Sequence, residues 1–224
     1  MHSANLTPSK IYILTRDEAM FKAFFFAGDP AADLLGLKTV DILRFPDNSG
    51  LLLNHLWTKS LRSGYVHVFA LKRGTNTCVC PVRGIELYFS ISRSMGVKVN
   101  FGFLFRSVTK SVNISLQGLN STAAQARLNA YTTSMSHSLS SAHFTLHGFR
   151  SGTAVFLARA GLRLHEVMDR VGWKNSKTAL HYIKLKQVVN PAGAAATLAD
   201  LNIETDQTYK RLNNLKDFSQ AFQD

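Results

Sequence analysis

The chain has 224 residues, of which 46% are hydrophobic and 18% charged, a balance that excludes a disordered or fibrous chain and predicts one folded domain with a terminal extension. Lysine and arginine number 26 against 14 acidic residues, and the formal charge of +12 indicates a polyanionic partner such as nucleic acid. No apolar run approaches the roughly 20 residues of a membrane span and residues 1–10 lack a signal-peptide core, so we expect no membrane partner and an intracellular protein, nuclear if eukaryotic.

The N-terminal part of the chain predicts two helices around a tight turn. The sequence TRDE at residues 15–18 has the pattern of a capping box, and the apolar residues 19–27 behind it predict a buried helix that ends at Gly28. Asp29 is a candidate cap for a second, leucine-rich helix. Pro30 falls at the first position of that helix, where its missing N–H costs little.

A β-hairpin is expected next. Residues 51–57 and 65–71 are rich in apolar, aromatic and β-branched side chains, and the polar residues 58–64 connect them. This part of the chain therefore predicts a small antiparallel sheet.

Two cysteines precede the following helix. Cys78 and Cys80 are too close for an ordinary disulfide within a strand and too few for a structural zinc site, so we interpret them as buried or neutral thiols in a reducing compartment. Pro81 opens a helix whose apolar residues recur at helical spacing until Gly96. Residues 101–105 should be extended or loop-like.

Helices dominate the rest of the chain. Residues 123–135 predict one helix, and a serine-rich loop at residues 134–142 follows it. Residues 150–160 predict another, and the glycines Gly161 and Gly172 should end this helix and a short one after it.

The last elements complete the expected fold class. Ser176 is a candidate cap for a third short helix, which carries Tyr182, and residues 206–222 predict a terminal helix. The fold expected from these patterns is α+β and mainly helical, with a small antiparallel sheet.

Four residues have the chemistry that phosphodiester transfer without a metal needs. An arginine such as Arg150 can hold a phosphate in a forked grip, and His147 and Trp173 can donate hydrogen bonds to its other oxygens. The hydroxyl of Tyr182 can act as the nucleophile. A phosphotyrosine ester conserves the bond energy, so strands can be resealed without ATP, and no metal or cofactor is required.

Each of these residues also has an ordinary explanation. Tyr182 alone would be an amphipathic helix residue, and His147 a capping or core histidine. Trp173 fits simple packing under a loop. His181 points to another side of the helix and is interpreted as incidental. The spacing of Tyr182 from Trp173 and Arg150 decides against the ordinary explanation of Tyr182.

That spacing resembles the signature of the tyrosine recombinases and integrases, which is H-x-x-R, then glycine followed by histidine or tryptophan, then tyrosine. In this chain His147 and Arg150 form the first element of the signature. Trp173 lies 23 residues after Arg150, and Tyr182 lies 9 residues after Trp173. The resemblance covers about residues 15–185. The catalytic domain of this family is the implied fold.

Further stretches carry the resemblance. Residues 27–35 look like the first motif of the family, and the hairpin looks like the small sheet where the family carries a catalytic lysine. Residues 102–106 and the pair Gly28-Asp29 are similar to recombinases of DIRS and Ngaro retroelements, a mobile-element type. In the hairpin Lys59 is the candidate general acid, with Arg62 as the less favoured substitute.

The resemblance implies a function and partners. The substrate is double-stranded DNA, which is cleaved and rejoined through a 3′-phosphotyrosine, and the protein self-associates on DNA. The implied domains are an N-terminal extension (1–14), the catalytic domain (15–189) and a C-terminal tail (190–224) with a docking helix. The implied roles are nucleophile for Tyr182, phosphate binding for Arg150 and His147, support for Trp173, and general acid for Lys59.

The sequence departs from the family pattern in two places. Pro30 stands where the family has the first of two phosphate-binding arginines, and Arg16 and Arg44 flank the motif without a spacing that brings either to the phosphate. Loss of such a donor costs about 2–4 kcal/mol, so we expect weak or absent cleavage with DNA binding kept. The residues before the domain are also too few for the N-terminal clamp domain of full recombinases, which predicts a fragment or a degraded element.

Two other functions remain open. A non-enzymatic DNA-binding remnant is favoured by Pro30 and by the missing clamp. A type IB topoisomerase resembles the family in its catalytic residues, although the spacing from His147 to Tyr182 favours a recombinase. A covalent DNA adduct separates binding from chemistry, and the topology of the product separates the two enzymes.

Overall fold

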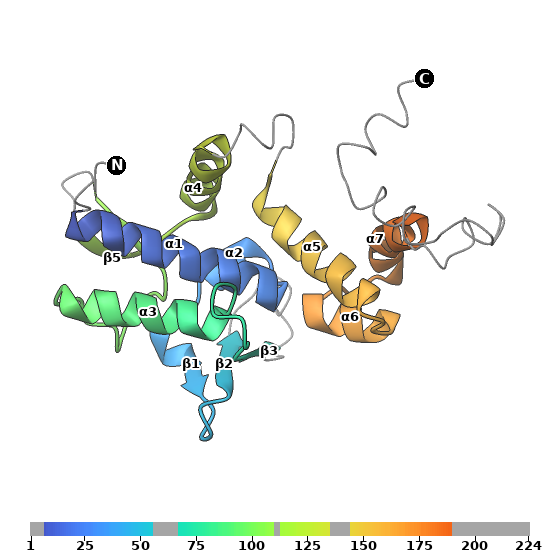
Figure 1. Ribbon diagram of the computed structural model, residues 1–224, viewed down its shortest axis with the longest axis horizontal. Coiled ribbons are helices and arrows are strands. Elements are labelled where there is room, and N and C mark those ends of the chain that lie inside the picture. The colour runs from blue at the N-terminus through green and yellow to red at the C-terminus, as the bar shows by residue number, and fades with distance from the viewer. Residues whose placement is uncertain (1–6, 56–66, 110–112, 135–143, 190–224) are drawn as a thin grey trace. The chain divides into compact units, whose positions relative to one another are not determined.

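The computed structural model of the chain describes residues 7–55, 67–109, 113–134 and 144–189 (Figure 1). The chain divides into two compact units, Met1–Thr153 and Ala154–Asp224. The described residues form seven α-helices, one short 3-10 helix and five short strands, which confirms the mainly helical fold with a small antiparallel sheet. None of the helices in these ranges is both long and apolar enough to cross a membrane.

Helix α1 (Pro8–Ala27) begins earlier than the sequence predicts. Thr7 caps this helix, because its side chain accepts a hydrogen bond from the backbone N–H of Lys10 at 3.3 Å. The predicted cap at residues 15–18 is therefore wrong. The predicted end is confirmed, because Gly28 has a φ of 69° and closes the helix in the left-handed conformation.

The predicted capping box is a pair of buried charges inside α1. The hydroxyl of Thr15 donates to the carbonyl of Ile11 at 3.0 Å, as a hydroxyl in mid-helix does. Arg16 and Asp17 are both buried, and their side chains pair at 2.6 Å. The prediction failed because the residue types of this buried ion pair are the same as those of a capping box at a helix start.

Asp17 is the centre of a network within the first unit. Its second carboxylate oxygen accepts hydrogen bonds from Arg127 at 2.6 Å and from the hydroxyl of Tyr131 at 3.0 Å, both on α4 (Ser121–Ser134). Arg16 donates to the backbone carbonyl of Arg106 at 2.8 Å. These donors replace the hydration that the buried carboxylate of Asp17 gives up.

Helix α2 (Ala31–Leu35) starts one residue later than expected. Pro30 immediately precedes it, with φ −56° and ψ 133°. A 3-10 turn, η1 (Thr39–Asp41), leads from α2 into the sheet.

The sheet of the first unit has the order β1-β2-β3 and is antiparallel. The predicted hairpin is confirmed as β2 (Gly50–His55) and β3 (His67–Lys72). Strand β1 (Ile42–Arg44), which pairs with β2, was not predicted because three residues are too few to show an alternating pattern.

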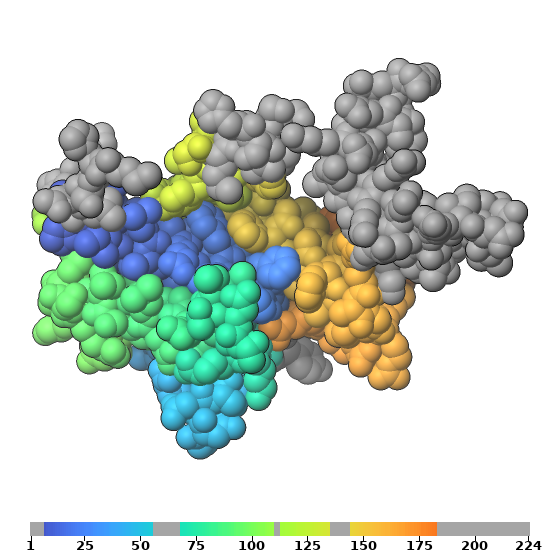
Figure 2. All heavy atoms as spheres, in the orientation of Figure 1, coloured from blue at the N-terminus to red at the C-terminus, as the bar shows by residue number. Residues whose placement is uncertain are grey.

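Helix α3 (Pro81–Ser94) lies beside α1, and Figure 2 shows their surfaces together in green and blue. Cys80 is buried and caps α3, whereas Cys78 is exposed, and neither forms a disulfide. A second hairpin follows, β4 (Arg106–Val108) and β5 (Ile114–Gly118), which was not predicted.

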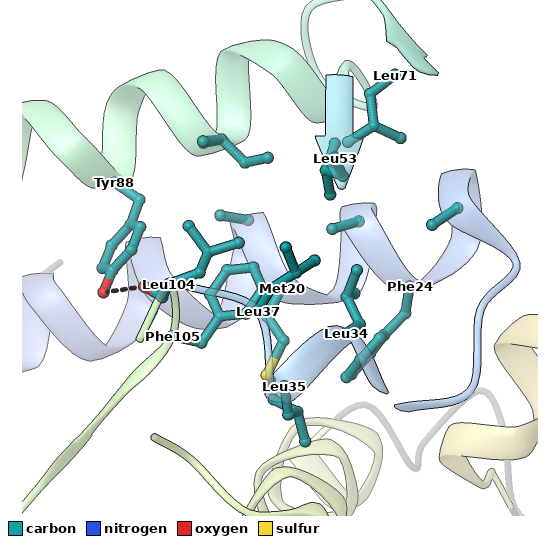
Figure 3. Close-up of a cluster of buried hydrophobic side chains, with 14 of the residues drawn as sticks. Met20, Phe24, Leu34, Leu35, Leu37, Leu53, Leu71, Tyr88, Leu104 and Phe105 are labelled. Atoms are coloured by element: carbon teal, nitrogen blue, oxygen red, sulfur yellow. Dashed lines mark hydrogen bonds between the residues drawn. The ribbon is translucent and has the colours of Figure 1, made fainter. Parts of the chain in front are cut away.

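The core of the first unit lies between α1, α2, α3 and the inner face of the sheet (Figure 3). Leu53 and Leu71 face the helices from β2 and β3, while Tyr88 on α3 donates its hydroxyl hydrogen to the carbonyl of Leu104 at 3.0 Å. The hydroxyl oxygens of Tyr12 and Tyr88 lie 2.9 Å apart. These contacts hold α1 against α3.

Helix α5 (Leu146–Arg159) begins in the first unit and ends in the second, which also holds α6 (Leu164–Val171) and α7 (Ser176–Val189). Four small or β-branched side chains form the core of the second unit: Ala154, Ala158, Val167 and Val171. The predicted breaks are confirmed, because Gly161 and Gly172 have φ angles of 92° and 64°. Residues 206–222 lie outside the described residues.

Candidate functional site

The candidate site residues fall in both units. His147 and Arg150 lie on the part of α5 that belongs to the first unit, and Trp173 and Tyr182 belong to the second unit. The structure therefore brings the residues together in two pairs. Lys59 and its substitute Arg62 lie outside the described residues.

The first pair lies on the first turns of α5. This helix starts at Leu146, four residues before the predicted start, so His147 is inside the helix and not in a loop before it. Residues three apart share one face of a helix, and His147 and Arg150 are therefore neighbours. His147 is exposed, whereas Arg150 is half-buried with its Nε atom buried.

The neighbouring side of these turns is fixed against α1 through Phe149 and Thr153. The ring of Phe149 stacks on Phe21, with centroids 5.6 Å apart and an interplanar angle of 10°, and also contacts Phe24 at 5.9 Å. The hydroxyl of Thr153 bonds to the carbonyls of Phe149, at 2.8 Å, and of Phe25. Since backbone and side chains are both held, the direction in which Arg150 leaves the helix is set by packing.

Helix α4 supports the same contact. The ring of Phe21 meets Tyr131 edge-on at 6.0 Å, and the hydroxyl of Tyr131 bonds to the buried Asp17. Burial, and next the neighbouring carboxylate, raise the pKa of Tyr131, which therefore stays a neutral donor. The backbone N–H of Leu146 donates to the side chain of Gln125 on α4 at 2.9 Å.

The sequence resemblance predicts the family's first phosphate-binding arginine at the turn before α2. Pro30 offers no charge there, and the preceding Asp29 is buried. The carboxylate oxygen Oδ2 of Asp29 lies 3.2 Å from Nε2 of His55 at the end of β2, and each of the two side chains is only 2% exposed. The ring of His55 meets Phe69 edge-on at 5.2 Å.

Sequence reasoning did not identify His55. His55 also lines a cavity of about 250 Å³ between the end of α2 and β2. The other lining residues are Asp33, Gly36, Leu37, Lys38, Asp41 and Asn54.

The two arginines that flank this turn in the sequence are both bonded to other residues. Arg16 is 2% exposed and bonded to Asp17 and to the carbonyl of Arg106. Arg44 pairs with Glu86 on α3 at 2.5 Å. Both guanidinium groups are therefore already engaged.

The second pair is a stack of aromatic rings. Trp173 follows Gly172, which ends α6, and its backbone N–H donates to the carbonyl of Met168 at 2.9 Å. Its ring lies 5.0 Å from the ring of Tyr182, at an interplanar angle of 14°. Both side chains are half-buried. Trp173 also packs against the core of the second unit and so connects that core to Tyr182.

Two details differ from the sequence reading of α7. The side chain of Asn175, just before the helix, accepts a hydrogen bond from the backbone N–H of Lys177 at 2.8 Å and thus acts at the cap position expected of Ser176. His181 is not separate from Tyr182, because their rings meet edge-on at 5.4 Å.

Within residues 7–55, 67–109, 113–134 and 144–189, no group of three or more histidine, cysteine, aspartate or glutamate side chains is placed to hold a metal ion.

The fold is similar to those of solved recombinases. XerH site-specific recombinase in a post-cleavage complex with palindromic difH substrate has a TM-score of 0.56 and 16% identity, over 83% of this chain and 44% of that chain. XerA recombinase has a TM-score of 0.55 and 15% identity, over 81% of this chain and 60% of that chain.

The likeness is one of structure. No protein-family model matches the sequence, and no curated protein matches it. The chain spans about half the length of the two recombinases, 44% and 60%. Its mainly helical architecture with a small antiparallel sheet is the fold of a tyrosine recombinase catalytic domain.

Proposed function

We propose that the chain is a tyrosine recombinase domain that binds double-stranded DNA and derives from an enzyme of strand cleavage and rejoining. The observation that carries the proposal is the recombinase fold. The formal charge of +12 and the similarity to XerH in complexes with difH substrate before and after cleavage support DNA as the partner.

The chemistry follows from the residue types. The hydroxyl oxygen of Tyr182 attacks the scissile phosphorus and loses its proton, and the bond from phosphorus to the 5′ oxygen breaks. The 3′ end is then held as a phosphotyrosine ester, and Lys59 gives a proton to the 5′ oxygen. Rejoining reverses these steps when a 5′ hydroxyl attacks the ester.

The remaining residues bind and position the phosphate. Arg150 and His147, which share one face of α5, donate to the non-bridging oxygens, where negative charge builds up in the transition state. Trp173 holds the ring of Tyr182 by stacking and has an indole N–H to offer.

Pro30 weakens or abolishes this chemistry. The loss of one preorganised donor costs about 2–4 kcal/mol, or about 30- to 1,000-fold in rate. The backbone is not the obstacle, because φ −56° and ψ 133° are accessible to arginine as well as to proline. Position 30 is therefore suited to a restoring substitution.

A nicked suicide substrate tests the proposal. The unaltered chain, Pro30→Arg and Pro30→Arg with Tyr182→Phe are incubated with nicked duplex DNA and then denatured. We expect an adduct that forms much faster with Pro30→Arg and disappears with Tyr182→Phe. No adduct from any version would refute strand cleavage.

A second candidate is a catalytically inactive DNA-binding remnant of a mobile element of the DIRS or Ngaro type, and the specific observation in its favour is Pro30. Its result in the same assay is DNA binding without an adduct, even from Pro30→Arg. Self-association on DNA also belongs to the proposal, and the mass of the DNA complex tests it.

A further inference from the structure

A buried contact ties the turn before α2 to the end of β2. Asp29 lies between Gly28, which ends α1, and Pro30, which precedes α2. Its Oδ2 is 3.2 Å from Nε2 of His55, the last residue of β2. The contact joins two elements that are 26 positions apart in the sequence.

The surroundings make this contact specific. Both side chains are 2% exposed, and the ring of His55 is held edge-on by Phe69 of the neighbouring strand. A buried carboxylate is strongly unfavourable without polar partners, and the close contact between Oδ2 of Asp29 and Nε2 of His55 supplies one at a fixed place. The position of Asp29 is thus coupled to the register of the sheet.

We propose that Asp29 and His55 are positioning residues, which set the location of residue 30 at the phosphate-binding corner of the site. The inference rests on the proposed function, because that function places a phosphate-binding arginine at position 30. Adjacent Cα atoms are about 3.8 Å apart, so fixing Asp29 closely confines residue 30. The pair therefore keeps the backbone of residue 30 in place although this residue is a proline and not an arginine.

Two backbone hydrogen bonds next to position 30 can report a movement of the turn. The backbone N–H groups of Asp33 and Leu34 both donate to the carbonyl of Pro30, at 3.0 Å and 3.2 Å. Movement of the turn weakens these two bonds. The exchange rates of these amide protons with solvent therefore measure its position, whether or not the protein has activity.

The first experiment compares three variants of the full chain by amide NMR. His55→Phe keeps an aromatic ring but removes the nitrogen that contacts Asp29, while His55→Gln keeps a polar side-chain amide without the ring. Val68→Thr on β3 is the matched control, because this side chain is 45% exposed and similar in shape after substitution. We expect exchange at Asp33 and Leu34 to rise about tenfold or more with His55→Phe, to recover mostly with His55→Gln, and to stay unchanged in the control.

The second experiment places the same variants in the Pro30→Arg background and measures the rate of adduct formation. A displacement of about 1 Å in an active site costs on the order of 100-fold, so His55→Phe should slow the reaction by about 10- to 100-fold. Unchanged exchange, or an unchanged rate in an active Pro30→Arg chain, would overturn the inference. If Pro30→Arg forms no adduct, the recombinase proposal fails, while the amide exchange still decides whether the pair positions the turn.

Discussion

At the scale of single residues, the charge of Glu86 is fixed by two arginines of the sheet region. Its carboxylate accepts hydrogen bonds from Arg73 at 2.9 and 2.8 Å and from Arg44 at 2.5 Å. The bonds from Arg73, and next those from Arg44, lower the pKa of Glu86 from 4.5 to about 2. The folded protein therefore binds this proton more weakly than the unfolded chain does.

We predict that Glu86→Gln removes a pH-dependent part of the stability. A lowered pKa stabilises the fold above the unfolded value of 4.5, and the contribution is lost as the pH falls toward about 2. The side chains are partly exposed, so the loss at neutral pH should be about 1 kcal/mol. Urea denaturation of both proteins across this range is the measurement, and parallel curves would contradict the prediction.

A second prediction concerns Gly28, which ends α1 with a φ of 69°. Alanine in the left-handed region costs about 1–2 kcal/mol, so Gly28→Ala should lower the free energy of unfolding by that amount. Gly152→Ala is the control, because Gly152 is helical and a Cβ there would be 3.7 Å from the nearest atom, of Phe25. The control should be stabilising, by about 0.5–1 kcal/mol, in the same denaturation assay. Equal effects of the two changes would show that the conformation of Gly28 is not the cause.

The sequence makes only some residues of the candidate site visible. His147, Arg150, Trp173 and Tyr182 are candidates because their chemistry and spacing can be seen along the chain, and their roles stay a prediction. His55 is not visible in this way, since its contact with a residue 26 positions away depends on the register of β2 and on the turn after α1. A pairing between distant elements leaves no periodic trace in the sequence.

At the scale of elements, two tyrosines connect α1 and α3. The hydroxyls of Tyr12 and Tyr88 lie 2.9 Å apart, and Tyr88 also donates to the carbonyl of Leu104. Burial, and next the neighbouring Tyr88, raise the pKa of Tyr12 far above its usual value of 10.0. Burial also raises the pKa of Tyr88. Both groups are therefore neutral in the folded protein.

We predict that this pair makes the fold sensitive to alkali. A raised pKa gives a stabilising contribution that is complete below the unfolded value of 10.0 and is lost as the pH rises above it. Tyr12→Phe should cost about 1 kcal/mol at neutral pH through the lost hydrogen bond and should reduce the loss of stability above pH 10.0. Thermal unfolding at increasing pH is the test, and an equally steep loss in the variant would refute the prediction.

The elements themselves were predictable when they were long or ended at a marked residue. Helices α3, α4, α6 and α7 and the hairpin β2–β3 follow from periodicity, proline and glycine. The early start of α1 was missed because a buried ionic pair imitates a cap. The strands β1, β4 and β5 have three to five residues, too few for a pattern, and they form only because neighbouring segments pair with them.

At the scale of the whole molecule, the charge of +12 predicts a strong effect of salt on DNA binding. The logarithm of the binding constant should fall linearly with the logarithm of the salt concentration, by about 0.9 for each phosphate contacted. Arg150→Ala should make the slope shallower by about 1 and Pro30→Arg should make it steeper by about 1. Fluorescence anisotropy with labelled duplex DNA measures both, and a binding constant independent of salt would contradict an interface with phosphates.

The recombinase fold itself was predictable at this scale. The spacing from His147 to Tyr182 and the helix breaks between them led to the same fold class that the structural similarity supports. The sequence resemblance predicts that Pro30 is a departure from the family pattern, and the structure adds that Arg16 and Arg44 are bonded to other residues.

The identity of the residue that carries DNA tests the central claim most directly. The adduct from Pro30→Arg is digested with protease and nuclease, and the peptides are sequenced by mass spectrometry. We predict that the nucleotide remnant is attached to Tyr182 through a 3′ phosphate. Attachment to another residue, such as the nearby His181, or the absence of any modified peptide would contradict the account.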